Sequence, residues 1–145
     1  MSIYEQAMEF KRKYPKTVCF RKKAHSSVVE LHLNPDEKVL FVFMGQKNDR
    51  VYDIFTSCCV AVTNKRILIG QKRVVWGYFL VSITPDLYND LSVYQGLLFG
   101  KIIIDTVKEV TTITDLPKKA LNTIETSITE MMMNEKKCYV KRGEM

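Results

Sequence analysis

The chain has 145 residues, of which 46% are hydrophobic and 26% charged, and its formal net charge is +6 at pH 7. This length and composition are typical of one soluble globular domain with its own core, and they exclude an intrinsically disordered chain. No apolar run approaches the roughly 20 residues that cross a bilayer. Residues 1–15 lack the apolar core and the cleavage site of a signal peptide. The sequence therefore predicts a cytoplasmic protein without a transmembrane segment.

Most of the positive charge lies near the N-terminus. Residues 1–24 hold seven basic and two acidic residues, a net charge of +5, whereas the other 121 residues hold 15 basic and 14 acidic residues, a net charge of +1. Because the main part is nearly neutral, nucleic acid is not an expected partner. The seven basic residues are Lys11, Arg12, Lys13, Lys16, Arg21, Lys22 and Lys23.

These seven cations are the candidate contact residues for an anionic membrane surface or another polyanion. Phe10, Tyr14 and Phe20 are interleaved with them, a combination that suits a membrane interface or a row of phosphates. The alternative, which we favour, is a solvated helix face whose aromatic side chains pack on the rest of the domain or on a neighbouring subunit.

The N-terminal part predicts two short helices. Apolar residues recur at spacings of three and four along residues 2–14, which defines one helix face that ends before Pro15. Residues 17–33 repeat the pattern less regularly, and Asn34-Pro35 marks their end. Both segments are too short and too charged to form a domain alone.

From residue 36 onward the periodicity becomes that of β-strands. Residues 38–44 form a continuous apolar run, as expected for a strand covered on both faces, a polar loop follows over 45–53, and residues 54–62 alternate between two faces. Five more strands follow, interrupted by Pro85. The seven predicted strands cover residues 38–44, 54–62, 66–71, 74–83, 87–94, 97–106 and 108–114.

A C-terminal helix is predicted after the last strand. Asp115 is a good N-cap, and Pro117 is tolerated in a first turn. An apolar stripe at helical spacing follows, which is wide enough to lie on a sheet and to close the open end of a barrel. It consists of Leu121, Ile124, Ile128, Met131 and Met132. The pattern ends at Asn134, so residues 135–145 are predicted to form a mobile tail.

The four cysteines predict no metal site. Cys19, Cys58, Cys59 and Cys138 have no C-x-x-C spacing. Neighbours on a strand point to opposite faces, so Cys58 and Cys59 cannot both bind one tetrahedral metal. We expect small buried thiols in a reducing compartment.

The chain carries no signature of an enzyme. It lacks G-x-S-x-G, H-E-x-x-H, P-loop and G-x-G-x-x-G motifs. Its two histidines, His25 and His32, share one helix face, but no cysteine or carboxylate is spaced to complete a metal site with them. We therefore expect no catalytic residue, no metal and no cofactor.

Two further motifs admit a structural and a functional interpretation. Thr63-Asn64-Lys65-Arg66 predicts the turn of a buried hairpin, in which Lys65 and Arg66 either contact an anion or, as we favour, keep the turn soluble and in register. Trp76, Tyr78 and Phe79 form an aromatic cluster. We expect core packing for at least some of these rings, with one side left as a contact surface.

Five sequence pieces, taken in order, resemble the bacterial pleckstrin-homology-like domain. The five pieces are LNPDEKVLFVF, VAVTNKRILIG, a strand with the pair S-I, a Gly-rich turn into the isoleucine-rich strand KIIIDT, and the helix LPKKA. Together they span about residues 34–134. The resemblance implies a mainly β, α+β fold, in which a split barrel of about seven antiparallel strands is capped by a C-terminal helix. The implied division is a helical extension at 1–33, the domain at 34–134 and a flexible tail at 135–145.

The resemblance implies little about activity, because this fold supports many roles. In eukaryotic members that bind phosphoinositides, the loop between the first two strands carries a basic cluster. Here the loop offers Lys47 and Arg50 but also Asp49 and Asp53, which argues against a specific headgroup site there. We therefore expect a non-enzymatic module that acts by protein–protein contact and self-association as a homo-oligomer. The alternative is peripheral binding to an anionic lipid surface through the basic N-terminal segment.

Overall fold

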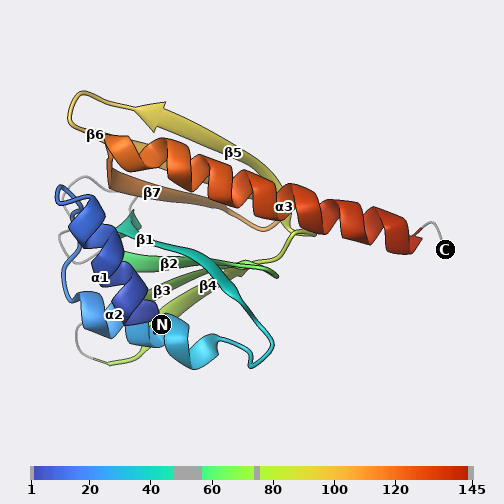
Figure 1. Ribbon diagram of the computed structural model, residues 1–145, viewed down its shortest axis with the longest axis horizontal. Coiled ribbons are helices and arrows are strands. Elements are labelled where there is room, and N and C mark those ends of the chain that lie inside the picture. Colours follow the sequence, from blue (N-terminus) through green and yellow to red (C-terminus); the bar gives the residue numbers. More distant parts are fainter. Residues whose placement is uncertain (1, 48–56, 74–75, 144–145) are drawn as a thin grey trace.

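The computed structural model describes the backbone of residues 2–47, 57–73 and 76–143, and the side chains of these residues up to 134 (Figure 1). Two helices, α1 (Ile3–Lys13) and α2 (Lys22–His32), precede seven strands, and a 3₁₀ turn η1 (Lys118–Ala120) leads into the long helix α3 (Leu121–Gly143). The strands are β1 (Val39–Lys47), β2 (Ser57–Thr63), β3 (Ile67–Lys72), β4 (Tyr78–Ile83), β5 (Tyr88–Gln95), β6 (Phe99–Thr106) and β7 (Val110–Pro117).

The strands form one antiparallel sheet in the order β4-β3-β2-β1-β7-β6-β5. The sheet curls into a half-barrel, with β1–β4 below and β5–β7 above in Figure 1. α3 lies across the concave side, and α1 and α2 cover the outer face of β1–β3. The predicted fold class, a mainly β barrel with a C-terminal helix and two N-terminal helices, is confirmed.

Two apolar cores lie on the two faces of β2, which is why every residue of this strand is buried. Cys58, Val60 and Val62 face the concave core, whereas Cys59 and Ala61 face the helices. The alternation predicted for this strand is therefore correct over its described residues, and the two neighbouring cysteines point to opposite sides. Residues 54–56 of the predicted strand lie outside the described residues.

The apolar stripe predicted for the C-terminal helix forms part of the concave core. All five of its residues are buried there: Leu121, Ile124, Ile128, Met131 and Met132. Gly100 on β6 allows this contact, since a Cβ atom at Gly100 would collide with the Leu121 side chain. On the outer face, a Cβ at Gly70 would lie only 2.7 Å from Cγ2 of Val29 on α2. The two glycines thus let one helix approach each face of the sheet.

The hairpin turn predicted at residues 63–66 is present, but Arg66 points into the protein. The amide of Thr63 donates to the carbonyl of Arg66 at 2.9 Å and closes the turn between β2 and β3. The Arg66 guanidinium donates to both carboxylate oxygens of Glu37, at 3.0 and 3.1 Å, and to the carbonyl of His32 at 2.9 Å. The Glu37 side chain is fully buried. Arg66 therefore links the β2–β3 turn to the end of α2 and to the segment before β1.

Lys65, by contrast, is exposed and pairs with Asp36. Both cations of the turn thus bind carboxylates of the chain itself, in keeping with a structural role. Burial alone would raise the pKa of Glu37, but hydrogen bonds from Arg66 and Thr63 outweigh burial and hold that pKa below its usual value.

Asp115 is not the N-cap of the C-terminal helix, contrary to the prediction. It lies within β7 in the left-handed region, at φ 56°, and β7 continues to Pro117 because Leu116 and Pro117 still pair with Gly100 and Phe99 of β6. The pairing register shifts between Gly100 and Ile102, opposite Asp115. Cross-strand pairing thus outweighs the local capping signal, and the helix starts at Leu121 after η1.

Two helix boundaries also differ from those predicted. α2 begins at Lys22 and not at residue 17, because Arg21 adopts the left-handed conformation at φ 52° and Thr17 and Cys19 are buried in the preceding segment. α3 continues to Gly143, so residues 135–143, predicted as part of a mobile tail, have a helical backbone. That segment contains three lysines, one arginine and one glutamate, all good helix formers, and has no Gly or Pro before Gly143.

Candidate interaction surfaces

β4 is one of the two edges of the open sheet, and among the residues that the structure describes it pairs with β3 alone. Its six residues, Tyr-Phe-Leu-Val-Ser-Ile, include no charge and no proline, and its pairing with β3 shows no bulge. The other edge, β5, carries Asp90, has a register shift between Tyr88 and Asp90, and lies against α3. Charges, bulges and covering helices are the usual protection of sheet edges. β5 has all three, whereas β4 has neither a charge nor a bulge and is contacted by α2 on its outer face.

The aromatic cluster next to β4 lies at the surface. The exposed fractions are 76% for Trp76, 50% for Tyr78 and 51% for Phe79. The prediction that some of these rings pack in the core is therefore wrong, because β4 is an edge strand whose first residues extend beyond both cores. The Tyr78 hydroxyl lies 3.1 Å from Nε2 of His32, and the Arg73 guanidinium lies 5.1 Å from the Phe79 ring centroid. All three rings are therefore exposed, and their use as a contact surface stays a prediction.

The seven basic residues of the N-terminal segment have different surroundings. Lys11 donates to the carbonyls of Pro15 and Thr17, at 2.6 and 2.7 Å, and so holds the α1–α2 connection in place. Arg21 donates to the carbonyl of Arg73 at 3.4 Å, beside the β3–β4 turn. Lys22 is the first residue of α2 and Lys23 the second, while Arg12 lies exposed in the last turn of α1. Lys13 and Lys16 lie elsewhere, in a cleft.

The N-terminal aromatic residues pack mostly on the chain's own barrel, as the favoured alternative predicted. Phe10 is buried in the concave core, 5.9 Å from the Phe41 ring and 6.4 Å from the Phe43 ring between centroids, and Tyr14 packs beside it. Phe20 is 55% exposed. The basic segment is therefore fixed to the domain and not a free arm.

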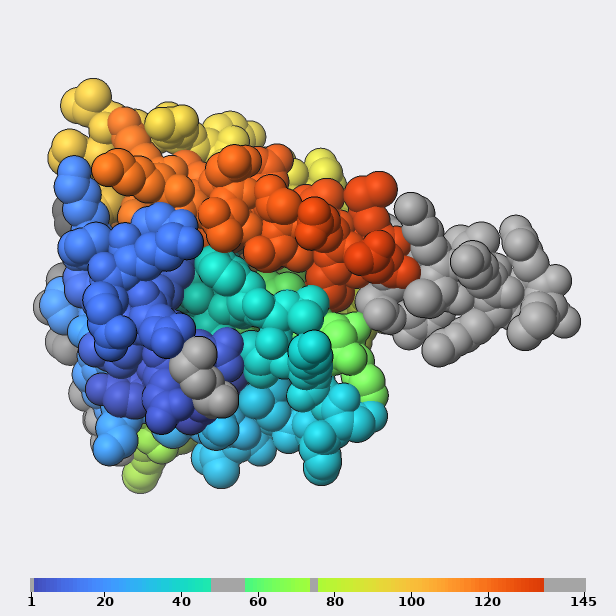
Figure 2. Space-filling view, in the orientation of Figure 1, coloured from blue at the N-terminus to red at the C-terminus, as the bar shows by residue number. Residues whose placement is uncertain are grey.

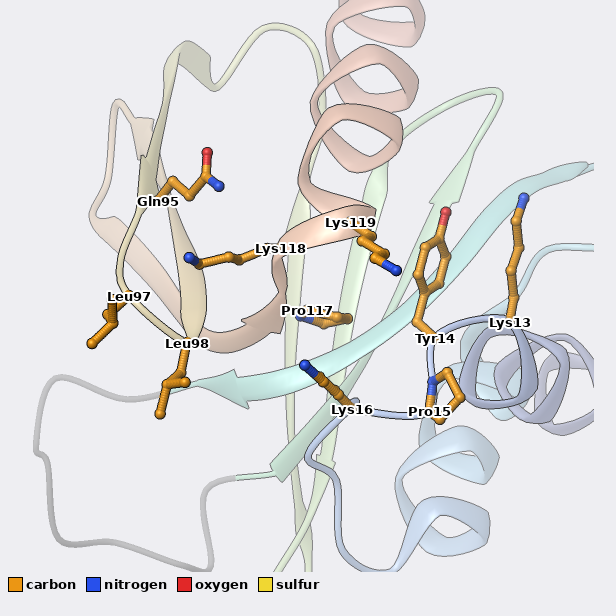
Figure 3. A pocket seen from close by; sticks show the side chains of 10 residues that line it. All are labelled: Lys13, Tyr14, Pro15, Lys16, Gln95, Leu97, Leu98, Pro117, Lys118 and Lys119. Carbon is orange, nitrogen blue, oxygen red and sulfur yellow. The ribbon is translucent and has the colours of Figure 1, made fainter.

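A cleft of about 610 Å³ joins three distant parts of the chain (Figure 3). One wall is the end of α1 with its following loop, the second is the β5–β6 turn, and the third is the junction of β7 with η1. Figure 2 shows the end of α1 beside the start of α3 on this side of the molecule. The lining residues are Lys13, Tyr14, Pro15, Lys16, Gln95, Leu97, Leu98, Pro117, Lys118 and Lys119.

The charge of this cleft is entirely positive. Four of its ten lining residues are lysines and none is acidic. Among the described residues, no ion pair engages any of these lysines. Figure 3 shows the amino groups of Lys16, Lys118 and Lys119 distributed around Pro117. Sequence reasoning found Lys13 and Lys16 but missed the other two, because only the fold brings residues 118 and 119 next to residues 13 and 16.

The buried polar and thiol groups are structural. Nδ1 of His25 accepts a hydrogen bond from the Lys72 amide at 2.8 Å, and burial lowers the pKa of His25 to about 4. Burial raises the pKa of Cys19 to about 11 and that of Cys59 to about 12, so these thiols are poor nucleophiles. Cys138 lies outside the described side chains. No group of three or more potential metal ligands occurs in the part of the chain that the structure describes.

In the described ranges, no helix has both the length and the apolar composition needed to cross a bilayer. No curated protein matches the chain. Among solved structures, a pleckstrin homology domain from Shewanella amazonensis SB2B is 13% identical, with a TM-score of 0.43; the match covers 78% of this chain and 86% of that one.

A family model described as "Bacterial PH domain" matches residues 33–130 of the chain. The match includes all seven strands and the part of α3 that packs in the concave core up to Ile128. The chain therefore belongs to the bacterial PH domain family.

Proposed function

We propose that this PH domain is a non-enzymatic interaction module that associates with a second copy of itself through β4. The PH fold supports an interaction module in general. The observation that carries the finer proposal is the edge of β4, which pairs with no second strand among the described residues and carries exposed aromatic side chains.

An edge strand without charge, proline or bulge is a template for pairing with another strand. Two copies of β4 placed antiparallel around a two-fold axis satisfy the unpaired amides and carbonyls of both edges in a single closed interface. The exposed rings of Trp76 and Phe79 lie at the start of this edge and are available to such an interface. Large aromatic side chains are the residues that contribute most to protein interfaces.

The interface proposed is small, since β4 has only six residues. Specific interfaces of limited area belong to weak or transient associations. We therefore expect a dimer whose population depends on protein concentration and not a permanent one.

The experiment is sedimentation velocity of the full chain over a concentration series. The wild-type protein is expected to shift from monomer to dimer. Phe79→Lys is expected to remain monomeric, because it places like charges next to each other in the paired edges. Tyr94→Lys on β5 is the matched control, since Tyr94 is 52% exposed and Phe79 51%, and it is expected to dimerise like the wild type. A wild-type monomer at every concentration, or a Phe79→Lys dimer, would exclude the proposal.

A second candidate function is contact of the basic N-terminal segment with an anionic surface. Its support is that five of the seven cations, Arg12, Lys13, Lys16, Arg21 and Lys23, are exposed. It predicts salt-sensitive binding to anionic vesicles that weakens when Arg21 and Lys23 are neutralised. Its weakness is that the cations have different surroundings, since Lys13 and Lys16 line the cleft whereas Arg21 donates to the carbonyl of Arg73.

A further inference from the structure

The β5–β6 turn at the rim of the lysine-lined cleft has an unusual composition. The Gly96 amide donates to the Phe99 carbonyl at 2.9 Å, so Leu97 and Leu98 occupy the two central positions of the turn. Such positions normally hold Gly, Asn, Asp or other polar residues. The leucine side chains are 89% and 70% exposed. Two adjacent leucines at the tip of a rigid hairpin have no partner that accounts for them among the described residues.

The four lysines of the cleft lie next to this apolar tip. Lys118 and Lys119 directly follow β7, whose Pro117 pairs with Phe99 at the base of the turn, while Lys13 and Lys16 come from the opposite wall. Figure 3 shows the leucines at one side of the cleft and the lysines around its centre. Strand pairing places the backbone of the turn, and the Lys11 hydrogen bonds place the loop that carries Lys16.

We propose that this cleft is a docking site for the surface of an anionic phospholipid bilayer. In this arrangement Leu97 and Leu98 enter the boundary between headgroups and acyl chains, and the four lysines meet the lipid phosphates around them. Apolar side chains flanked by cations are what a charged membrane interface favours. A nucleic acid fits less well, because single strands are bound by stacking on aromatic faces. The one aromatic residue among the ten that line the cleft, Tyr14, packs against the concave core, and the exposed rim presents leucines.

The site is distinct from β4, so it does not depend on self-association. It also differs from binding by the basic N-terminal segment, because half of its lysines and both leucines come from the C-terminal half of the chain. Each lysine near an anionic membrane surface contributes roughly fivefold to binding. Neutralising two of them is therefore expected to weaken binding by roughly 10- to 30-fold.

The test is co-sedimentation of the full chain with vesicles of phosphatidylcholine, with or without phosphatidylglycerol. The wild type is expected to bind only the vesicles that contain phosphatidylglycerol, and less as salt increases. Lys118→Gln/Lys119→Gln and, separately, Leu97→Ser/Leu98→Ser are each expected to lower the affinity by roughly tenfold or more. All four positions are exposed or half-buried, so the variants are expected to unfold thermally near the wild-type temperature.

Two matched controls locate the binding site. Arg21→Gln/Lys23→Gln removes the same charge from the other basic surface, and Val107→Ser/Lys108→Gln makes an equivalent change in the exposed β6–β7 turn at the other end of β6. Both are expected to bind as the wild type does. If either control variant lost as much vesicle binding as the cleft variants, binding would come from general attraction between the basic protein and the anionic surface, and the proposed site would be wrong. Binding that survives Leu97→Ser/Leu98→Ser but is displaced by inorganic phosphate would reveal a soluble-anion site, and no binding to anionic vesicles would exclude the proposal outright.

Discussion

Arg66 contacts more parts of the fold than its position in a hairpin turn suggests. Its guanidinium binds the buried carboxylate of Glu37 through two hydrogen bonds, the carbonyl at the end of α2, and the Ser82 hydroxyl of β4 at 3.2 Å. Removing one partner of a buried ion pair leaves the other charge without compensation. The cost of such a change is much larger than that of losing an exposed pair.

Arg66→Ala is therefore expected to lower the free energy of unfolding by about 3–5 kcal/mol. Arg66→Lys is expected to fall between this variant and the wild type, since a lysine cannot make the paired hydrogen bonds to the carboxylate. The measurement is urea denaturation followed by circular dichroism. Lys65→Ala, which removes the exposed neighbour, serves as the control and should change stability little. Equal effects at both positions would refute the buried role of Arg66.

His25 makes stability depend on pH. It is 2% exposed, and burial lowers its folded pKa from 6.5 to about 4. In the unfolded chain it takes up a proton near pH 6.5, whereas in the folded protein it stays neutral. The stability from neutral His25 is therefore fully present above pH 6.5 and is lost as pH falls towards 4, with a total of about 3 kcal/mol.

His25→Asn tests this dependence, because the asparagine oxygen can accept the Lys72 hydrogen bond without titrating. Urea denaturation between pH 7.5 and pH 4.5 should show a smaller loss of stability in the variant than in the wild type. Parallel curves for the two proteins would mean that His25 does not determine the acid sensitivity.

At the scale of elements, the contact between α3 and β6 requires a glycine at position 100. Gly100 lies under Leu121, the first residue of the helix, and a Cβ there has no room. Gly100→Ala is expected to destabilise the protein by about 1–3 kcal/mol through overpacking. Adding Leu121→Ala should restore part of the loss, although Leu121→Ala alone is destabilising. Thermal unfolding of the two single variants and the double variant gives the coupling free energy between positions 100 and 121. Strictly additive effects on stability would contradict the steric explanation.

The ends of helices and strands were predicted less well than their interiors. The strand pattern predicted β2 correctly over its described length, because both faces of that strand are buried and the residue types alternate regularly. The N-cap prediction at Asp115 was wrong, because β6 supplies pairing partners for Leu116 and Pro117 that no local pattern reveals. The aromatic cluster was misplaced in the core for a similar reason, since a sequence does not show which strand lies at an edge.

At the scale of the whole molecule, the two proposed surfaces lie on different parts of the half-barrel. β4 is at the bottom in Figure 1, and the β5–β6 turn is at the top. A dimer through β4 would thus carry two lysine-lined clefts. Two clefts on one dimer bind a common surface more tightly than either alone, provided that both reach it.

The sequence by itself determined the fold class, the order of helices and strands, the two faces of β2 and the apolar stripe of α3. Alternation and helical spacing follow directly from burying one or both faces of an element. The tertiary structure alone decided which charges come together. The cleft joins Lys13 and Lys16 to Lys118 and Lys119 across about a hundred positions of the chain, and it separates them from Arg21 and Lys23. The physical reason is that charges at a surface obey no periodicity, so their neighbours are set only by how the sheet curls and where its ends meet.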